Sequence, residues 1–175
     1  MDAYELLTRE LGADRVIRSA EALDVYARDE SGRGVFPPDA AVLCDSRAEI
    51  ELVLRLAAEH KIPVTPRGTG TGMTGGALPV RGGLVLSTER MKRIIDISVD
   101  DRIAIVEPGV INADLQAAVE SQSMFYAPDP ASLAAAADHK PRVLARPEPV
   151  RSRPTQGSRA SEPCAPWVPC GSLSG

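Results

Sequence analysis

Cysteine and histidine are scarce in this sequence of 175 residues, which contains three cysteines and two histidines. Cys44, Cys164 and Cys170 form neither the framework of a disulfide-stapled domain nor the spacing of a zinc site. Cys164 and Cys170 have no histidine or cysteine partner at zinc-ligand spacing, so the sequence predicts no metal centre. A chain with so few cysteines fits a reducing compartment, and we expect a cytoplasmic protein.

Long apolar runs are also missing. No run approaches the roughly 18 to 20 residues that a membrane-spanning helix needs. The first five residues, Met-Asp-Ala-Tyr-Glu, lack the basic start of a secretory leader. The formal net charge of −4 gives no sign of a basic face for nucleic acid, while 43% hydrophobic residues are typical of a globular domain. We therefore expect no transmembrane segment and no nucleic-acid partner.

Glycine is concentrated in one segment, residues 67–76, which reads Arg-Gly-Thr-Gly-Thr-Gly-Met-Thr-Gly-Gly. A loop with so few side chains allows another group to approach its main chain closely. Successive N–H groups in such a loop form a concave site for an anion, and the threonines add hydroxyl donors. The segment predicts a site for the phosphate or diphosphate of a nucleotide cofactor.

Two common nucleotide loops do not fit this segment. A Walker loop needs a lysine directly after its last glycines, but no lysine lies between Lys61 and Lys92. A Rossmann fingerprint matches as a string at residues 70–75, but it must open a helix. Pro79, Gly82 and Gly83 follow instead, and these residues disfavour a helix.

The flanking sequence alternates between apolar runs and helical periodicity. Ser46 precedes a helical pattern as an N-cap, with Glu49 placed to complete a capping box, and Asn112 is placed as the cap of a later helix. Helices are predicted at 2–11, 19–26, 46–60 and 112–121, and strands at 40–44, 62–66, 83–87, 91–97 and 103–106. This order predicts an α/β or α+β fold with two small strand–helix–strand units.

Several motifs occur in the order typical of one enzyme family. Residues 63–76 resemble the diphosphate loop of FAD-linked oxidases of the p-cresol methylhydroxylase and vanillyl-alcohol oxidase superfamily, in the branch of the glycolate oxidase FAD-linked subunit and D-lactate dehydrogenase. Residues 26–31, 38–40, 83–91, 107–110 and 128–132 match further family segments. The resemblance covers about residues 20–132. It implies an α+β fold made of two small α/β subdomains of a PCMH-type FAD-binding domain, the second truncated, at residues 36–132, after a helical lead-in at 1–35.

The resemblance also implies which residues bind the cofactor. Main-chain N–H groups and threonine hydroxyls of the loop are expected to meet the FAD diphosphate, and two later residues to line the flavin. The predicted set is Arg67, Gly68, Thr69, Gly70, Thr71, Gly72, Thr74, Gly75, Gly76, Pro128 and Ser132. Arg67 has an alternative role, pairing with a carboxylate to shape the loop, and Pro128 and Ser132 an alternative role as a plain turn. Because His60 and His139 lie outside the loop, we expect non-covalent FAD.

The activity implied by the resemblance is oxidation of a 2-hydroxy acid, of the glycolate or D-lactate type, to a 2-oxo acid, with a possible electron-transfer partner subunit. In the family, the groups that bind the substrate and abstract its proton belong to a C-terminal cap domain. The resemblance therefore implies no catalytic residue in this chain, and the chain alone is expected to be inactive. Two alternatives stay open. One is a non-catalytic nucleotide-binding module or a truncated product without function, and the other is a different oxidase or reductase, such as a UDP-linked cell-wall reductase or a sugar oxidase, with the same FAD fold.

Composition changes near residue 132. Residues 133–175 hold 7 of the 15 prolines and carry 6 basic against 3 acidic residues, while the first 132 carry 14 against 21. The family continues here with a Gly-Gly-Asn segment, whereas this chain continues with Leu-Ala-Ala-Ala-Ala-Asp. Residues 133–175 are therefore expected to be either a disordered tail or the product of a lost reading frame.

Overall fold

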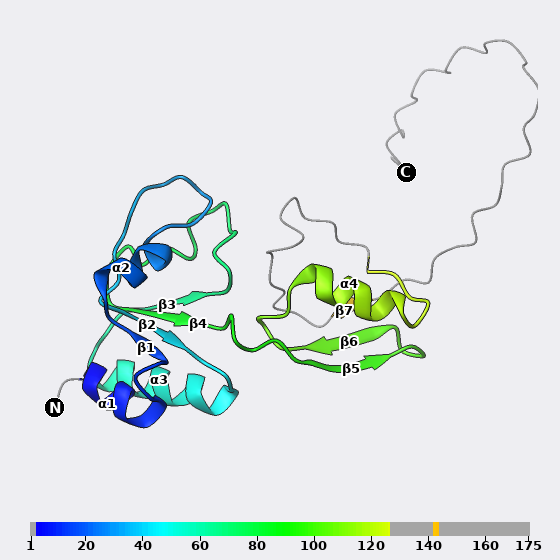
Figure 1. The fold of residues 1–175 in the computed structure, drawn as a ribbon, viewed down its shortest axis with the longest axis horizontal. Coiled ribbons are helices and arrows are strands. Elements are labelled where there is room, and N and C mark those ends of the chain that lie inside the picture. Colours follow the sequence, from blue (N-terminus) through cyan, green and yellow to red (C-terminus); the bar gives the residue numbers. More distant parts are fainter. Residues whose placement is uncertain (1–2, 127–141, 144–175) are drawn as a thin grey trace, which may run out of the picture.

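The computed structural model describes residues 3–126 and 142–143, which form two sheets with their own helices (Figure 1). The first part of the chain contains α1 (Ala3–Leu11), β1 (Val16–Ile17), α2 (Ala20–Leu23), the 3-10 helix η1 (Asp24–Ala27), β2 (Ala40–Leu43), α3 (Arg47–Glu59), β3 (Val64–Arg67) and β4 (Leu84–Ser87). The second contains β5 (Ile94–Ser98), β6 (Ile103–Val106), α4 (Asn112–Glu120) and β7 (Arg142–Val143). No helix among the described residues is long and apolar enough to cross a membrane.

The first sheet is built around β4. Its strand order is β1-β2-β4-β3, with β2 and β3 both parallel to β4 and β1 antiparallel to β2. Leu43 and Arg67 both pair with Ser87, so the three parallel strands end level with one another. The glycine-rich segment leaves β3 at this carboxyl edge, where ligands commonly bind in parallel sheets.

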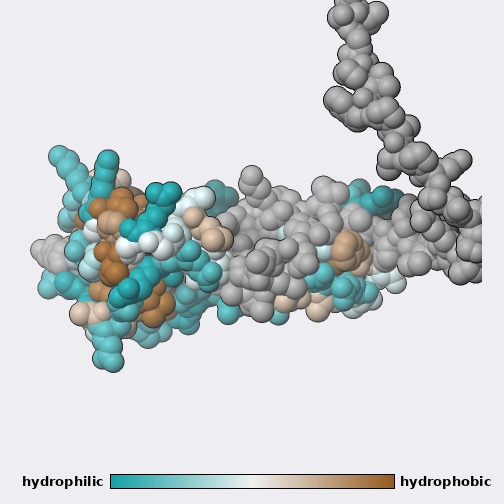
Figure 2. All heavy atoms as spheres, turned by 90° about the horizontal axis from the view of Figure 1, so that it is seen from above, coloured by the Kyte–Doolittle hydropathy of each residue, from teal (hydrophilic) through white to brown (hydrophobic). Residues whose placement is uncertain are grey.

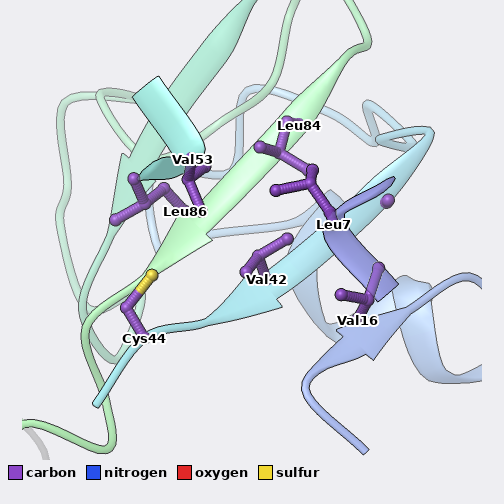
Figure 3. Close-up of a cluster of buried hydrophobic side chains, with 8 residues drawn as sticks. Leu7, Val16, Val42, Cys44, Val53, Leu84 and Leu86 are labelled. Atoms are coloured by element: carbon purple, nitrogen blue, oxygen red, sulfur yellow. The ribbon is translucent and has the colours of Figure 1, made fainter. Parts of the chain in front are cut away.

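One face of this sheet is covered by α1 and α3 (Figure 1). Because side chains alternate along a strand, every second residue of β2 and β4 points to this face. Figure 3 shows Val42, Leu84 and Leu86 converging with Leu7 of α1 and Val53 of α3. Cys44 belongs to the same cluster, as expected for a small core residue.

The opposite face is covered by the lead-in. Ala41 of β2 and Val85 of β4 pack against Leu23 of α2 and Tyr26 of η1. In Figure 1 this layer lies above the sheet, opposite α1 and α3. The lead-in is therefore part of the core of the first subdomain.

The capping signal before α3 is confirmed. The Ser46 hydroxyl accepts a hydrogen bond from the Glu49 N–H at 3.3 Å. The Glu49 carboxylate accepts from the Asp45 N–H at 2.7 Å, one residue before the cap. It also pairs with Arg15, whose guanidinium donates to the Leu43 carbonyl at 2.8 Å. This contact fixes the entry to α3 against β1.

The second sheet is antiparallel, with the order β5-β6-β7. One face packs on α4, where Ala104, Leu115, Val119 and Tyr126 are buried together. The outer face keeps apolar side chains in solvent, with Ile95 61% and Ile105 45% exposed. The capping prediction for the helix is wrong by one residue, because Ile111 is the N-cap and Asn112 is the first helical residue.

The turn after β6 joins the second subdomain to the first. The Glu107 carboxylate accepts from the Arg93 N–H and guanidinium, both at 2.8 Å. Two residues later, the Gly109 N–H donates to the Met91 carbonyl at 2.8 Å. A Cβ on Gly109 would lie 2.2 Å from the Thr88 carbonyl oxygen. Close main-chain approach at this turn requires glycine.

Two short strands were not expected from the sequence. β1 pairs with β2, which places a strand inside the predicted helical lead-in of residues 1–35. β7 pairs with β6 and falls within the predicted tail of residues 133–175. Each is two residues long, too short for a periodic pattern, and each is defined by pairing with a distant strand. The predicted turn at 128–130 and all other residues of the tail lie outside the described residues.

Gly109→Ala is expected to destabilise the protein by about 1 to 3 kcal/mol, because the new methyl group must displace main-chain atoms that cannot rotate away. Urea unfolding of both proteins measures the difference. Gly72→Ala is the matched control, since a Cβ at Gly72 meets nothing within 4 Å. An equal effect of the two substitutions would contradict the interpretation that close main-chain packing at this turn requires glycine.

The Arg93–Glu107 contact is expected to make the free energy of unfolding depend on pH in the acidic range. The hydrogen bond from Arg93 holds the pKa of the Glu107 carboxyl below its usual range. The stabilisation is complete above the unfolded pKa of about 4.3 and is lost as the pH falls through the lower folded pKa. Glu107→Gln should therefore lower the urea midpoint at pH 7 and flatten its decline between pH 5 and 3. Glu51→Gln, which breaks an exposed pair with Arg47, should keep the wild-type pH profile.

Candidate functional site

The glycine-rich loop encloses a cavity of about 410 Å³. Its lining residues are Pro66, Arg67, Gly68, Thr69, Gly70, Thr71, Gly72, Thr74, Gly76 and Ala77. Eight of the eleven residues predicted for the cofactor site therefore line one cavity. Gly75 lies in the same loop without lining it, and Pro128 and Ser132 lie outside the described residues.

The main chain of this loop offers unpaired donors. Across the described part of the chain, no N–H between Gly68 and Gly76 donates a hydrogen bond to another protein group. Proteins normally pair such groups within secondary structure or leave them to water or a ligand. A run of free N–H groups around a cavity is suited to the several acceptor oxygens of an anion.

Two glycines of the loop adopt conformations that other residues rarely take. Gly70 has φ +83° and Gly75 has φ +84°. A Cβ on Gly75 would lie 2.7 Å from Cδ of Arg33, which packs against the loop from the lead-in. Replacing either glycine would change the direction of the neighbouring N–H groups.

Arg67 shapes the loop, as one of its two predicted roles has it, but its partners are main-chain carbonyls and not a carboxylate, and its contact with a phosphate stays a prediction. Its side chain is directed to the lead-in, and it donates to the Arg28 carbonyl at 2.7 Å and to the Val25 carbonyl at 3.0 Å. The residue is only 7% exposed, and burial lowers the pKa of the guanidinium. Arg67 does shape the loop, but through main-chain carbonyls.

The ring of Tyr26 lies beside this guanidinium, with Cζ of Arg67 5.7 Å from the ring centroid. The Tyr26 hydroxyl donates to Glu89 at 3.0 Å. Burial, reinforced by the Glu89 carboxylate, raises the pKa of Tyr26 to about 12. Tyr26 is therefore a neutral hydrogen-bond donor at physiological pH and supports the Arg67 contact from below the loop.

Asp29 is a second link between the lead-in and the loop. Its carboxylate accepts hydrogen bonds from the hydroxyl and the N–H of Ser31. The Ser31 hydroxyl is the main cause of a lowered pKa at Asp29, with smaller contributions from Arg67 and from the Ala77 N–H. The next residue, Glu30, donates its N–H to the Gly70 carbonyl at 3.3 Å. Sequence reasoning assigned no site role to residues 25–30, because no local pattern indicates contacts about 40 positions away.

A second cavity, of about 390 Å³, lies on the face that carries α2. Figure 2 views the molecule from above and shows hydrophobic residues intermixed with hydrophilic ones. The lining of the cavity includes Leu23, Val35, Pro37 and Asp39. Asp39 accepts from the Gly83 N–H at 3.0 Å, so it stabilises the entry to β4.

Histidine and cysteine do not reach the loop within the described residues. His60 is the C-cap of α3, and Cys44 is buried in the core. Burial raises the pKa of the Cys44 thiol to about 11, which makes it a poor nucleophile. No group of three or more potential metal ligands occurs among the described residues.

Residues 38–137 match the model of a family described as "FAD binding domain". The chain belongs to this family. The resemblance inferred from the motifs is thereby confirmed, and so is the α+β class of the PCMH-type domain. The matched segment contains the glycine-rich loop and most of both sheets.

Named relatives agree with this assignment. The glycolate oxidase subunit GlcD of Bacillus subtilis is 38% identical over 132 residues, 75% of this chain and 28% of that protein. A D-lactate dehydrogenase of Anaerostipes hadrus is 33% identical over 70% of this chain and 26% of its own length. The chain thus spans less than a third of these relatives.

Solved structures show the same fold. A p-cresol methylhydroxylase with substrate bound superposes with a TM-score of 0.69 and 27% identity, covering 77% of this chain and 27% of that one. An alkyldihydroxyacetonephosphate synthase gives a TM-score of 0.67 at 22% identity, again over 77% of this chain and 30% of its own.

Hydrogen exchange can test whether the loop donors are free. Amides of residues 68–76 are expected to exchange at nearly the rate of an unstructured peptide, because they have no acceptor among the described residues. Amides of β4, paired on both sides, should exchange orders of magnitude more slowly and serve as the internal control. Strong protection of the loop in the ligand-free protein would show that its N–H groups are already paired.

Proposed function

We propose that this chain contributes the diphosphate-binding part of an FAD-dependent oxidoreductase. The observation that carries the proposal is the run of N–H groups from Gly68 to Gly76 that find no acceptor in the described part of the chain, in a loop that lines one cavity. Two linked phosphates present several acceptor oxygens and need close approach to the main chain. The loop supplies donors, and its five glycines leave no side chain in the way.

The donor set fits FAD held without a covalent bond. Thr69, Thr71 and Thr74 add hydroxyl groups that can donate to the same phosphates. No histidine or cysteine among the described residues lines the cavity. The bond between protein and cofactor is then a set of hydrogen bonds that dissociate reversibly.

The reaction we propose is oxidation of a 2-hydroxy acid of the glycolate or D-lactate type to the 2-oxo acid. The support is similarity to relatives named glycolate oxidase subunit and D-lactate dehydrogenase. FAD supplies a hydride acceptor in such chemistry. The described residues bind and orient the cofactor's diphosphate, and we assign no substrate contact or proton transfer to them. The word subunit in the name of the first relative supports a partner chain, and we propose that this partner transfers electrons.

Titration of the purified chain with FAD, followed by flavin fluorescence, tests the binding proposal. We expect saturable binding of one FAD per chain. ADP should compete at least about tenfold better than adenosine, since charge-assisted hydrogen bonds to the diphosphate are lost with adenosine.

Failure to bind FAD would contradict the cofactor proposal for this chain. Binding of ADP and FAD with equal affinity would instead favour a general nucleotide-binding module. A chain that binds FAD and oxidises neither glycolate nor D-lactate would agree with a cofactor-binding part that needs the rest of the enzyme for turnover.

A further inference from the structure

Arg67, at the start of the glycine-rich loop, donates its side-chain hydrogen bonds to residues 25–28, which precede the loop by about 40 positions. We propose that Arg67 is a positioning residue that clamps the lead-in segment, residues 25–30, beneath the loop, and that this clamped segment is part of the diphosphate site. The proposal rests on the proposed function of the loop. It assigns the recognition of diphosphate to the main chain and gives Arg67 the task of holding that main chain in place.

The hydrogen bonds of Arg67 use the shape of its guanidinium. Nη1 donates to the Arg28 carbonyl and Nη2 to the Val25 carbonyl, so one planar group joins both ends of a single helical turn. Val25 lies within η1 and Arg28 is its C-cap, and carbonyls in the last turn of a helix lack partners within that helix. A lysine has one charged nitrogen and cannot reproduce this two-point contact.

Gly70 is held between the clamp and the lead-in. A Cβ on Gly70 would lie 2.0 Å from Nη2 and 2.4 Å from Cζ of Arg67, so the loop main chain rests directly on the guanidinium. From the other side, the Gly70 carbonyl accepts the Glu30 N–H at 3.3 Å. The hydrogen bond to the Gly70 carbonyl fixes the peptide plane between Gly70 and Thr71, and with it the direction of the Thr71 N–H, while the guanidinium fixes the position of the Gly70 main chain.

The charge of Arg67 is already balanced by the protein. Two carbonyl oxygens accept from it, and the charges of Asp29 and Glu89 both act on it. Tyr26 covers one side of the guanidinium as a neutral ring. A group so fully engaged has little to offer a phosphate directly, and its burial needs the lead-in acceptors to remain in place.

The first experiment measures the clamp without any cofactor. Limited trypsin digestion of the full chain reports cleavage after Arg28, relative to cleavage after Arg102 in the second subdomain. Arg67→Met should raise this ratio by about tenfold, because two hydrogen bonds from a charged donor are lost. Arg67→Lys should raise it nearly as much. Arg55→Met, at an exposed site on α3, is the matched control and should leave it unchanged.

The second experiment perturbs the lead-in and measures FAD affinity. Glu30→Pro removes the N–H that bonds to Gly70, at the second position of a turn where proline is tolerated. Glu30→Ala removes the same carboxylate but keeps the main-chain N–H. We expect Glu30→Pro to weaken FAD binding by at least about fivefold relative to Glu30→Ala, since one hydrogen bond contributes about this factor.

The outcomes separate the clamp from the cofactor proposal. Unchanged cleavage in Arg67→Met, or full rescue by Arg67→Lys, would overturn the clamp and favour a direct charge contact. Equal FAD affinity of Glu30→Pro and Glu30→Ala would overturn the role of the lead-in in the site. If the wild-type chain does not bind FAD, the proposed function fails, and the digestion still decides whether Arg67 holds the lead-in. If Arg67→Met unfolds entirely, both sites are cleaved as in free peptides and the ratio reports only unfolding, so the Glu30 pair decides.

Discussion

The structure around the loop depends on satisfying one buried guanidinium. Arg67 is the last residue of β3 and is almost enclosed, so its donors need acceptors inside the protein. The carbonyls of Val25 and Arg28 provide them, which requires η1 to lie against the carboxyl edge of the sheet. The same placement buries Tyr26 against β2 and β4. One polar contact thus couples the packing of the second sheet face to the geometry of the loop.

The loop itself balances two opposing requirements. Free N–H groups are needed for a diphosphate, yet a main chain without internal hydrogen bonds gains little order of its own. Here the order comes from outside the loop, through the Arg67 guanidinium under Gly70, the Glu30 N–H and the stem of Arg33 against Gly75. External support leaves the donors unused. A loop closed by its own hydrogen bonds would have used these N–H groups internally and left none for an anion.

Features encoded by neighbouring residues could be predicted from the sequence. The alternation in β2 and β4, the Ser46 cap and the glycine-rich loop all arise from contacts within a few positions, and each was found close to its observed place. Features defined by distant partners were missed. β1 and β7 exist through pairing with other strands, and the partners of Arg67 lie about 40 residues earlier in the chain. The pattern of the arginine and the glycines was compatible with phosphate contact and with a shaping role, and only the tertiary fold shows the carbonyls through which Arg67 shapes the loop.

The contacts of Arg67 tie the loop to residues that lie outside the segment that matches the family. That match begins at residue 38, whereas Val25, Arg28 and Glu30 all precede it. β1 also precedes it and pairs with β2, so the first sheet is incomplete without the lead-in. A shorter chain starting at residue 38 would keep every glycine of the loop and lose the acceptors that hold Arg67. Its guanidinium would then be free to turn toward the cavity, where it would compete with the main chain for the space and the anion that the intact fold reserves for the N–H groups.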